Sequence, residues 1–174
     1  MISIPARYAS AKYEDVPENI RQKFGKILQS RRGLYLHGGV GTGKTHIAYA
    51  LKKKLDKHTQ LKADFWNTSE LMQEIKEDFD RDAYSKTRVF DKMTEEKMPF
   101  FLDDIGSEKL TDWVLERFYL IINRKYNEMV PIIFTSNYSI EELADRIGDR
   151  IASRIVEMCD IIKIDGPDRR LNKK

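Results

Sequence analysis

The sequence has little of several features that would narrow its class at once. Its single cysteine, Cys159, excludes an intrachain disulfide framework and fits a reducing cytoplasm. No apolar run approaches the ~20 residues that span a bilayer, and residues 1–13 lack the continuous apolar core of a signal peptide. Neither charge sign dominates, because 31 basic and 28 acidic residues leave a formal net charge of +3. We therefore expect a cytoplasmic protein with no membrane partner, whose charge permits an anionic partner without requiring one.

The length of 174 residues fits a single domain, 1–174, and leaves no room for a second catalytic domain. Hydrophobic residues make up 41% of the sequence and charged residues 34%, as in a globular protein. Short buried strands are expected at 33–37, 62–66, within 99–106, at 130–135 and at 160–164, with helices between them. This alternation predicts an α/β fold with a five-stranded parallel sheet between helices.

Four of the nine glycines lie between positions 38 and 43, in the segment L-Y-L-H-G-G-V-G-T-G-K-T. This segment fits the phosphate-loop pattern G-x-x-x-x-G-K-[ST], in which backbone N–H groups bind nucleotide phosphates at a helix N-terminus. Lys44 should contact the β- and γ-phosphates, and Thr45 should ligate Mg²⁺. A plain glycine-rich turn is the weaker alternative, because an apolar strand precedes the loop and helical spacing follows it. The predicted nucleotide-binding residues here are Gly38, Gly39, Val40, Gly41, Thr42, Gly43, Lys44, Thr45 and His46.

A second motif, P-F-F-L-D-D-I-G at residues 99–106, is an apolar strand that stops at two adjacent carboxylates. It has the form of a Walker B strand. Asp103 is then expected to hold Mg²⁺ together with Thr45, and Asp104 to orient and activate the attacking water. Glutamate has this second role more often than aspartate. Two aspartates can also simply end a strand, but the upstream phosphate loop favours the catalytic interpretation.

The N-terminal residues 1–29 form an arm followed by an expected helix over 16–28. The arm could fold back over the adenine, with Tyr8 or Ile4 packing on the base. Ordinary packing of the arm is an equal alternative. A charged segment at 77–98 reads as an insertion or a mobile pair of helices, and residues 70–97 contain nine acidic and six basic side chains.

The strand at 130–135 is followed by Asn137, which should lie at the sheet edge where the γ-phosphate is expected. A helix beginning after Ser139 carries Arg146, Arg150 and Arg154 at four-residue spacing. Such a row is usually a solvated face.

Together these residues resemble the AAA+ ATPases of the DnaC/DnaI helicase-loader type, which are related to the DnaA initiator and to IstB. The resemblance covers nearly the whole chain and rests on the phosphate loop, on F-F-L-D-D-I-G-S-E, on F-T-S-N-Y-S and on the ending D-G-P-D-R-R. It implies ATP or ADP with Mg²⁺ as cofactors and an AAA+ core without a C-terminal helical lid. It also implies three roles: Asn137 as sensor 1, Arg154 or Arg150 as an arginine finger for a neighbouring subunit, and Arg170 or Arg169 as sensor 2.

Two main hypotheses follow from the resemblance. One is the ATPase module of a replicative helicase loader, which self-assembles with ATP on single-stranded DNA and contacts the helicase through a missing or separate N-terminal domain. The other is an IstB-like, ATP-dependent transposition helper whose partner is a transposase. A small-molecule kinase is a third, minor reading, because the sequence offers no acceptor-binding lid. A zinc-binding or helical domain upstream of Met1 would identify a loader fragment.

Residues 77–98 look like the initiator-specific element with which relatives contact DNA. The expected DNA contacts are Arg81, Tyr84, Lys86, Arg88 and Lys109. The alternative DNA-binding face is formed by Lys52, Lys53, Lys54 and Lys57.

Overall fold

A computed structural model describes the chain except residues 1–3, 60–62, 82–87, 96, 108–110 and 170–174. Its centre is the predicted parallel sheet of five strands, and the strand order is β2-β3-β4-β1-β5. The strands are β1 (Gly33–His37), β2 (Phe65–Asn67), β3 (Phe100–Asp103), β4 (Ile132–Ser136) and β5 (Cys159–Lys163). The three inner strands are almost wholly buried, as expected for a parallel sheet that helices cover on both sides.

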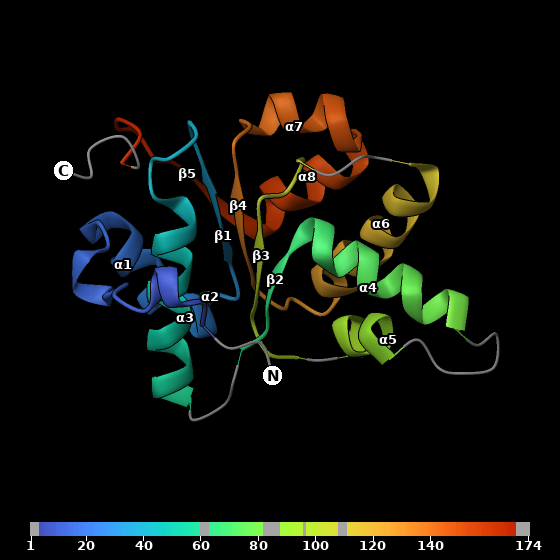
Figure 1. Cartoon of the computed structure of the whole chain (residues 1–174), viewed down its shortest axis with the longest axis horizontal. Coiled ribbons are helices and arrows are strands. Elements are labelled where there is room, and N and C mark those ends of the chain that lie inside the picture. Colours follow the sequence, from blue (N-terminus) through green and yellow to red (C-terminus); the bar gives the residue numbers. More distant parts are fainter. Residues whose placement is uncertain (1–3, 60–62, 82–87, 96, 108–110, 170–174) are drawn as a thin grey trace.

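Helices cover both faces of this sheet (Figure 1). One face carries η1 (Ala6–Tyr8), η2 (Tyr13–Asp15), α1 (Glu18–Gly25), α2 (Ile27–Ser30) and α3 (Lys44–Thr59). The other carries α4 (Thr68–Arg81), α5 (Arg88–Glu95), α6 (Asp112–Asn127), α7 (Ile140–Ile147) and α8 (Asp149–Met158). The two cores are separate because successive strand residues point to opposite faces: Leu34 and Leu36 lie in the first core, and Tyr35 lies in the second.

Two expected helices are each divided in the structure. The helix predicted over 16–28 separates at Lys26 into α1 and α2. The helix predicted after Ser139 ends at Ile147, because Gly148 adopts a φ of 86°, in the left-handed region that glycine tolerates. The expected capping box at Ser139 is present: its side chain accepts from the Glu142 backbone N–H, and the Glu142 carboxylate accepts from the Ser139 backbone N–H. The three arginines after Ser139 therefore do not lie along one continuous helix.

The charged segment expected at 77–98 does not start as a separate element. Its first residues continue α4, which begins at Thr68, and α5 then packs against both α4 and α6. The second and fifth strands also differ slightly from the predicted bounds of 62–66 and 160–164. Residues 60–62 lie outside the described part, but residues 63 and 64 are described and are not strand, so β2 begins later than predicted, at Phe65, and ends one residue later, at Asn67.

The sheet order places the polar ends of β1, β3 and β4 beside one another, since all strands point the same way. This edge, where the strand order changes direction, is where open α/β sheets bind ligands. After β5, the described residues up to Arg169 contain no further helix. Within the described residues no helix is long and apolar enough to cross a membrane.

Candidate nucleotide-binding site

The phosphate loop connects β1 to α3, as its strand-loop-helix context predicted. Gly38 and Gly41 have φ angles of 145° and 77°. A Cβ atom at Gly38 would lie 2.2 Å from the Ile164 carbonyl oxygen, and one at Gly41 would lie 1.8 Å from Asp168 Oδ1. The loop therefore needs glycine both for its backbone shape and for the close passage of the C-terminal segment.

Lys44, the first residue of α3, is 7% exposed and points across the loop. Its ammonium donates to the carbonyls of Gly38 and Gly39 at 2.7 and 2.8 Å and to Asn137 Oδ1 at 2.8 Å. Carbonyls of its own loop thus surround the charge. Three hydrogen bonds therefore hold the Lys44 ammonium against the loop and Asn137.

Asp103, at the end of β3, is 9% exposed and accepts from two hydroxyls. Thr45 Oγ1 lies 3.0 Å from Asp103 Oδ1, and Thr135 Oγ1 lies 2.5 Å from the same oxygen. Burial raises the pKa of Asp103 above its usual range, while the two threonine hydrogen bonds and Lys44 oppose that rise. A buried carboxylate paired with a hydroxyl is the donor set that a hard, oxygen-seeking cation such as Mg²⁺ uses. The residues present therefore fit the metal predicted for Thr45 and Asp103.

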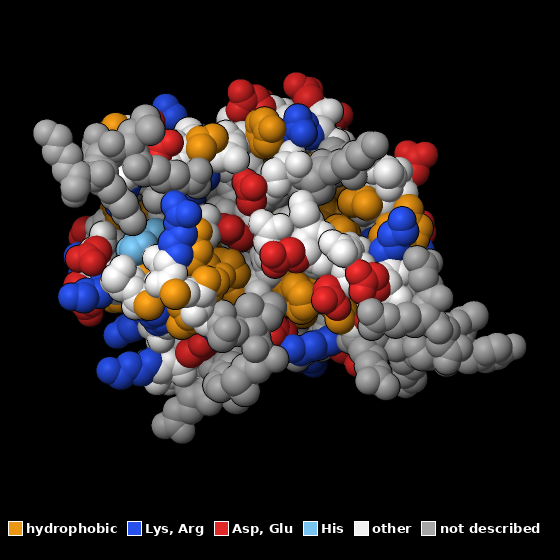
Figure 2. Space-filling view, viewed as in Figure 1, with side chains coloured by type: hydrophobic (Ala, Val, Ile, Leu, Met, Phe, Trp, Pro, Cys, Tyr) orange, Lys and Arg blue, Asp and Glu red, His pale blue; other side chains and the backbone are white. Residues whose placement is uncertain are grey.

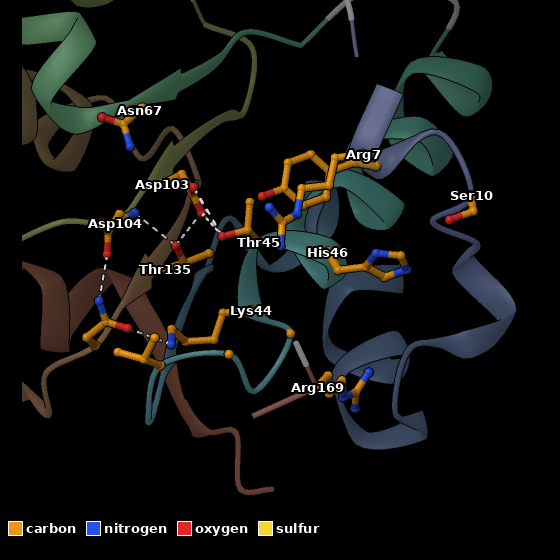
Figure 3. Close-up of a pocket in the computed structure, with 15 residues that line it drawn as sticks. Arg7, Ser10, Lys44, Thr45, His46, Asn67, Asp103, Asp104, Thr135 and Arg169 are labelled. Atoms are coloured by element: carbon orange, nitrogen blue, oxygen red, sulfur yellow. Dashed lines mark hydrogen bonds between the residues drawn. The ribbon is translucent and has the colours of Figure 1, made fainter. Parts of the chain in front are cut away.

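Asp104 follows at a φ of 60°, which is uncommon for a residue other than glycine. Its backbone N–H donates to Thr135 Oγ1 at 2.9 Å, and its Oδ1 accepts from Asn137 Nδ2 at 2.9 Å. Because Asn137 also accepts from Lys44, a continuous chain of side chains joins Lys44, Asn137 and Asp104. The structure thus brings together residues that are far apart in the sequence (Figure 3).

These groups open on a cavity of about 520 Å³, which is in the range of pockets that hold small ligands. Basic side chains from three separate segments, Arg7, Lys44 and Arg169, contribute to its wall, as a polyphosphate would require. The lining residues are Arg7, Tyr8, Ser10, Val40, Gly41, Gly43, Lys44, Thr45, His46, Asn67, Asp103, Asp104, Thr135, Asn137 and Arg169. Of the predicted loop residues, Gly38, Gly39 and Thr42 are not among those that line the cavity.

The N-terminal arm forms one side of the cavity. Tyr8 lines it, but the face of its ring stacks on Tyr49 at a centroid distance of 4.5 Å and an interplanar angle of 18°. Ile4 packs against the core formed by α1, α2 and α3. Ordinary packing therefore accounts for Ile4 and for one face of Tyr8. His46 lies edge-on to Tyr8 at 6.5 Å, and burial, followed by Arg169, lowers the pKa of His46.

The C-terminal segment, which the structure describes as far as Arg169, also contributes to the wall of the cavity. The Arg169 backbone N–H donates to the Gly41 carbonyl at 3.0 Å, and its side chain lines the cavity beside Gly43. Arg170, the residue chosen from the D-R-R ending, lies outside the described residues. Of the two arginines proposed for sensor 2, the described one, Arg169, lies at the pocket.

Arg150 and Arg154 do not line the cavity. Both guanidiniums lie over the Tyr119 ring, at 4.6 and 4.9 Å from its centroid, and both donate to its hydroxyl. Arg154 also donates to Asn123 Oδ1 at 2.9 Å. Arg146 instead stacks on Tyr138 and donates to the Gly106 carbonyl at 2.7 Å. The solvated row expected from spacing is confirmed for Arg146 and Arg150, which are exposed, whereas Arg154 is half-buried; all three side chains also contact α6 or the loop after β3.

In the alternative DNA-binding face on α3, Lys54 and Lys57 are exposed, whereas Lys52 is buried and Lys53 half-buried. Lys52 is 6% exposed and pairs with Asp56, while Lys53 donates to backbone carbonyls of the N-terminal arm. Lys54 lies over the Tyr13 ring at 5.2 Å. The first DNA-binding prediction lies beyond what the structure describes: Tyr84, Lys86 and Lys109 fall outside the described residues, as do the side chains of Arg81 and Arg88.

The sequence had not singled out four residues of this site. Thr135 lies in β4, two residues before Asn137, which follows directly after the strand, so the period of two could have placed both on one side. Asn67 ends β2 beside Asp103, as the strand register shows. Arg7 and Ser10 come from the irregular arm, for which no periodicity gives a direction.

A phosphate loop, a buried Asp103 beside Thr45, and Asn137 just after the adjacent strand β4 define a P-loop ATP-binding protein with the AAA+ fold. The family model described as "IstB-like ATP binding protein" matches residues 24–174. The chain belongs to this IstB-like ATP-binding family.

Comparison with individual proteins agrees with this assignment. The chain is 27% identical over 152 residues to the replicative helicase loader DnaI of Bacillus subtilis, covering 80% of the chain and 48% of DnaI. A crystal structure of the DnaC helicase loader matches with a TM-score of 0.81 at 27% identity, covering 92% of this chain and 100% of that one. The initiator DnaA bound to AMPPCP and single-stranded DNA has the same fold, with a TM-score of 0.76 at 20% identity over 91% of this chain and 51% of that one. The chain spans about half the length of the curated relatives it matches.

Proposed function

We propose that the chain is the ATP-binding and ATP-hydrolysing module of a replicative helicase loader. The observation that carries this proposal is the chain of contacts from Lys44 through Asn137 to Asp104, next to the Thr45 and Asp103 pair. Bound Mg²⁺ would supply charge neutralisation at the phosphates. Asp103 and Thr45 would hold it, Lys44 would bind the phosphates, and Asp104 would accept a proton from water that Asn137 helps to orient.

Hydrolysis by one subunit should be slow. None of the basic residues lining the cavity comes from α8, where the arginine-finger candidates lie, and Arg154 is held on the face formed with α6. A guanidinium from a neighbouring subunit can raise phosphoryl-transfer rates by several orders of magnitude. We therefore propose ATP-dependent self-assembly in which Arg154, or Arg150, reaches the neighbour's nucleotide. On the same basis Arg169 or Arg170 would act as sensor 2.

Helicase loading is favoured because the likeness to the DnaC loader extends over nearly the whole chain at 27% identity, and because a curated relative is the loader DnaI. Single-stranded DNA is the proposed nucleic-acid partner, and DnaA, which shares the fold, is a protein that binds it together with a nucleotide. The second candidate is an IstB-like transposition helper, which the family model over residues 24–174 favours.

The test uses a labelled single-stranded oligonucleotide and the whole chain, with ATP, with ADP and without nucleotide. We expect weak, salt-sensitive binding that needs ATP, and sedimentation should show larger assemblies with ATP. Replacing Lys86 and Arg88 together by alanine should weaken binding and flatten its salt dependence. Replacing Lys54 and Lys57 together removes the same charge from α3 and serves as the matched control. Binding that is equally strong without nucleotide would contradict the proposal.

The partner separates the two candidates. Purified replicative helicase and purified transposase from the same host would each be mixed with the ATP-bound chain, or with its full-length form, and complexes would be separated by size. A stable complex with the helicase alone supports the loader. A complex with the transposase alone supports the transposition helper and overturns the loader assignment.

A further inference from the structure

The N-terminal arm is fastened to α3 by one side chain. The Lys53 ammonium donates to three backbone carbonyls, those of Tyr8 at 3.1 Å, Ala9 at 2.6 Å and Ala11 at 3.0 Å. An ammonium group has three N–H donors, so each has one carbonyl acceptor here. Hydrogen bonds from a charged donor are stronger than neutral ones, and here they converge on the end of the η1 turn.

This fastening lies directly behind the nucleotide cavity. The turn held by Lys53 carries Arg7 and Tyr8, and Ser10 follows it; all three line the cavity. Figure 3 shows the side chain of Arg7 extending toward the cavity on the side of Thr45 and His46. Lys53 itself does not line the cavity.

A second contact fixes the arm from the other direction. Tyr8 stacks on Tyr49, Tyr49 stacks on Phe65 at 3.9 Å, and Phe65 stacks on Phe101 of β3 at 5.6 Å. The aromatic stack therefore runs from the arm to the strand that ends in Asp103. The stack makes no contact with the backbone carbonyls at the end of η1, where Lys53 donates; the Tyr8 carbonyl also accepts from the Ala11 N–H within the arm.

We propose that Lys53 is a positioning residue that builds the N-terminal wall of the nucleotide site, an inference that rests on the proposed nucleotide binding. With Lys53 in place the arm is docked before nucleotide arrives. Without it the arm is docked only part of the time, and apparent affinity falls by the docked fraction. If that fraction drops to one tenth, ATP and ADP both bind about tenfold more weakly. Turnover at saturating ATP stays near the wild-type value, because Asp103, Asp104 and Asn137 lie on other strands or at their ends.

The experiment compares Lys53→Met with Lys57→Met. Lys57 is an exposed lysine one turn further along α3, so the two variants lose the same charge from the same helix. Lys53→Arg is the conservative variant, since a guanidinium can donate to several carbonyls and should restore part of the affinity. Circular dichroism melting confirms that each variant is folded.

The first readout is hydrogen exchange of the nucleotide-free protein at the amides of Ala9 and Ala11, which donate to Ala6 and Tyr8 carbonyls within the arm. Lys53→Met should exchange faster there and Lys57→Met should match wild type. Equal exchange in all three proteins would show that Lys53 does not fasten the arm, and this result does not depend on nucleotide binding.

The second readout is affinity for a fluorescent ATP analogue and for ADP. A loss confined to Lys53→Met, with turnover at saturation kept, supports the proposal. Faster exchange with unchanged affinity would overturn it, because the arm would then be no part of the nucleotide site. A wild-type chain that binds no nucleotide would instead refute the proposed function, while the exchange measurement would still decide whether Lys53 fastens the arm.

Discussion

Replacing Thr135 by valine should destabilise the protein, because it removes two hydrogen bonds inside the nucleotide site. Thr135 is 1% exposed. Its hydroxyl donates to the Asp103 carboxylate and accepts from the Asp104 backbone N–H. A hydrogen bond to a charged group contributes about 1.5–3 kcal/mol and one between neutral groups about 0.5–1.5 kcal/mol. Valine has nearly the same shape, so no cavity term is added. We expect Thr135→Val to lower the free energy of unfolding by about 2–4.5 kcal/mol at neutral pH.

The same substitution should change the pH dependence. Burial already raises the pKa of Asp103, and the Thr135 hydrogen bond opposes that rise, so valine raises the pKa further. A carboxyl with a raised pKa contributes stability at acid pH and loses it as the pH rises through its folded-state pKa. The difference in the free energy of unfolding between the wild type and Thr135→Val should therefore grow from acid to neutral pH. The acid limb of Mg·ATP binding should also move to higher pH, since Mg²⁺ needs the carboxylate.

Urea unfolding at several pH values tests this prediction, with Thr135→Ser as the matched control. Serine keeps the hydroxyl and loses one methyl group, so its cost should be only about 0.5–1.5 kcal/mol and should not vary with pH in this way. If valine and serine variants have the same stability and the same Mg²⁺ dependence, the Thr135 hydroxyl does not hold Asp103 and Asp104.

Two further substitutions address binding and turnover separately. Lys44→Ala should abolish binding of a fluorescent ATP analogue, because it removes the main positive charge expected at the β- and γ-phosphates; undiminished affinity would refute the assignment of the loop. Arg154→Ala should lower turnover with little change in ATP affinity, since its guanidinium lies outside its own cavity. Turnover per subunit that does not depend on protein concentration, and that neither Arg150→Ala nor Arg154→Ala changes, would exclude a finger supplied by a neighbour.

The sequence was sufficient to predict the parallel α/β fold and the position of the phosphate loop. Both depend on local signals: buried apolar runs, helical spacing, and a glycine pattern with a direct chemical reason. Of the hydroxyl partners of Asp103 and Asp104, the sequence predicted Thr45 but not Thr135. Thr45 belongs to a known pattern, whereas Thr135 becomes a partner only when β3 and β4 lie side by side.

The errors of the sequence interpretation have a common physical cause. The arginine row was expected to be a solvated face and the α3 lysines an alternative DNA-binding face, yet Arg146 and Lys53 also donate to backbone carbonyls of segments far away in the chain. Long basic side chains reach acceptors that no local pattern reveals. The break at Gly148 was missed because an isolated glycine within a helical pattern is often tolerated.

The central claim is that Thr45 and Asp103 form the metal side of an ATP site. The most direct measurement is calorimetric titration of the wild-type chain and of Asp103→Asn with ATP, each with and without Mg²⁺. Asparagine can still accept from Thr135, and it removes a charge that burial disfavours, so the variant should be folded. We expect Mg²⁺ to strengthen ATP binding to the wild type and to have little effect on Asp103→Asn. An equal effect of Mg²⁺ on both proteins, or no ATP binding by the wild type, would contradict the account.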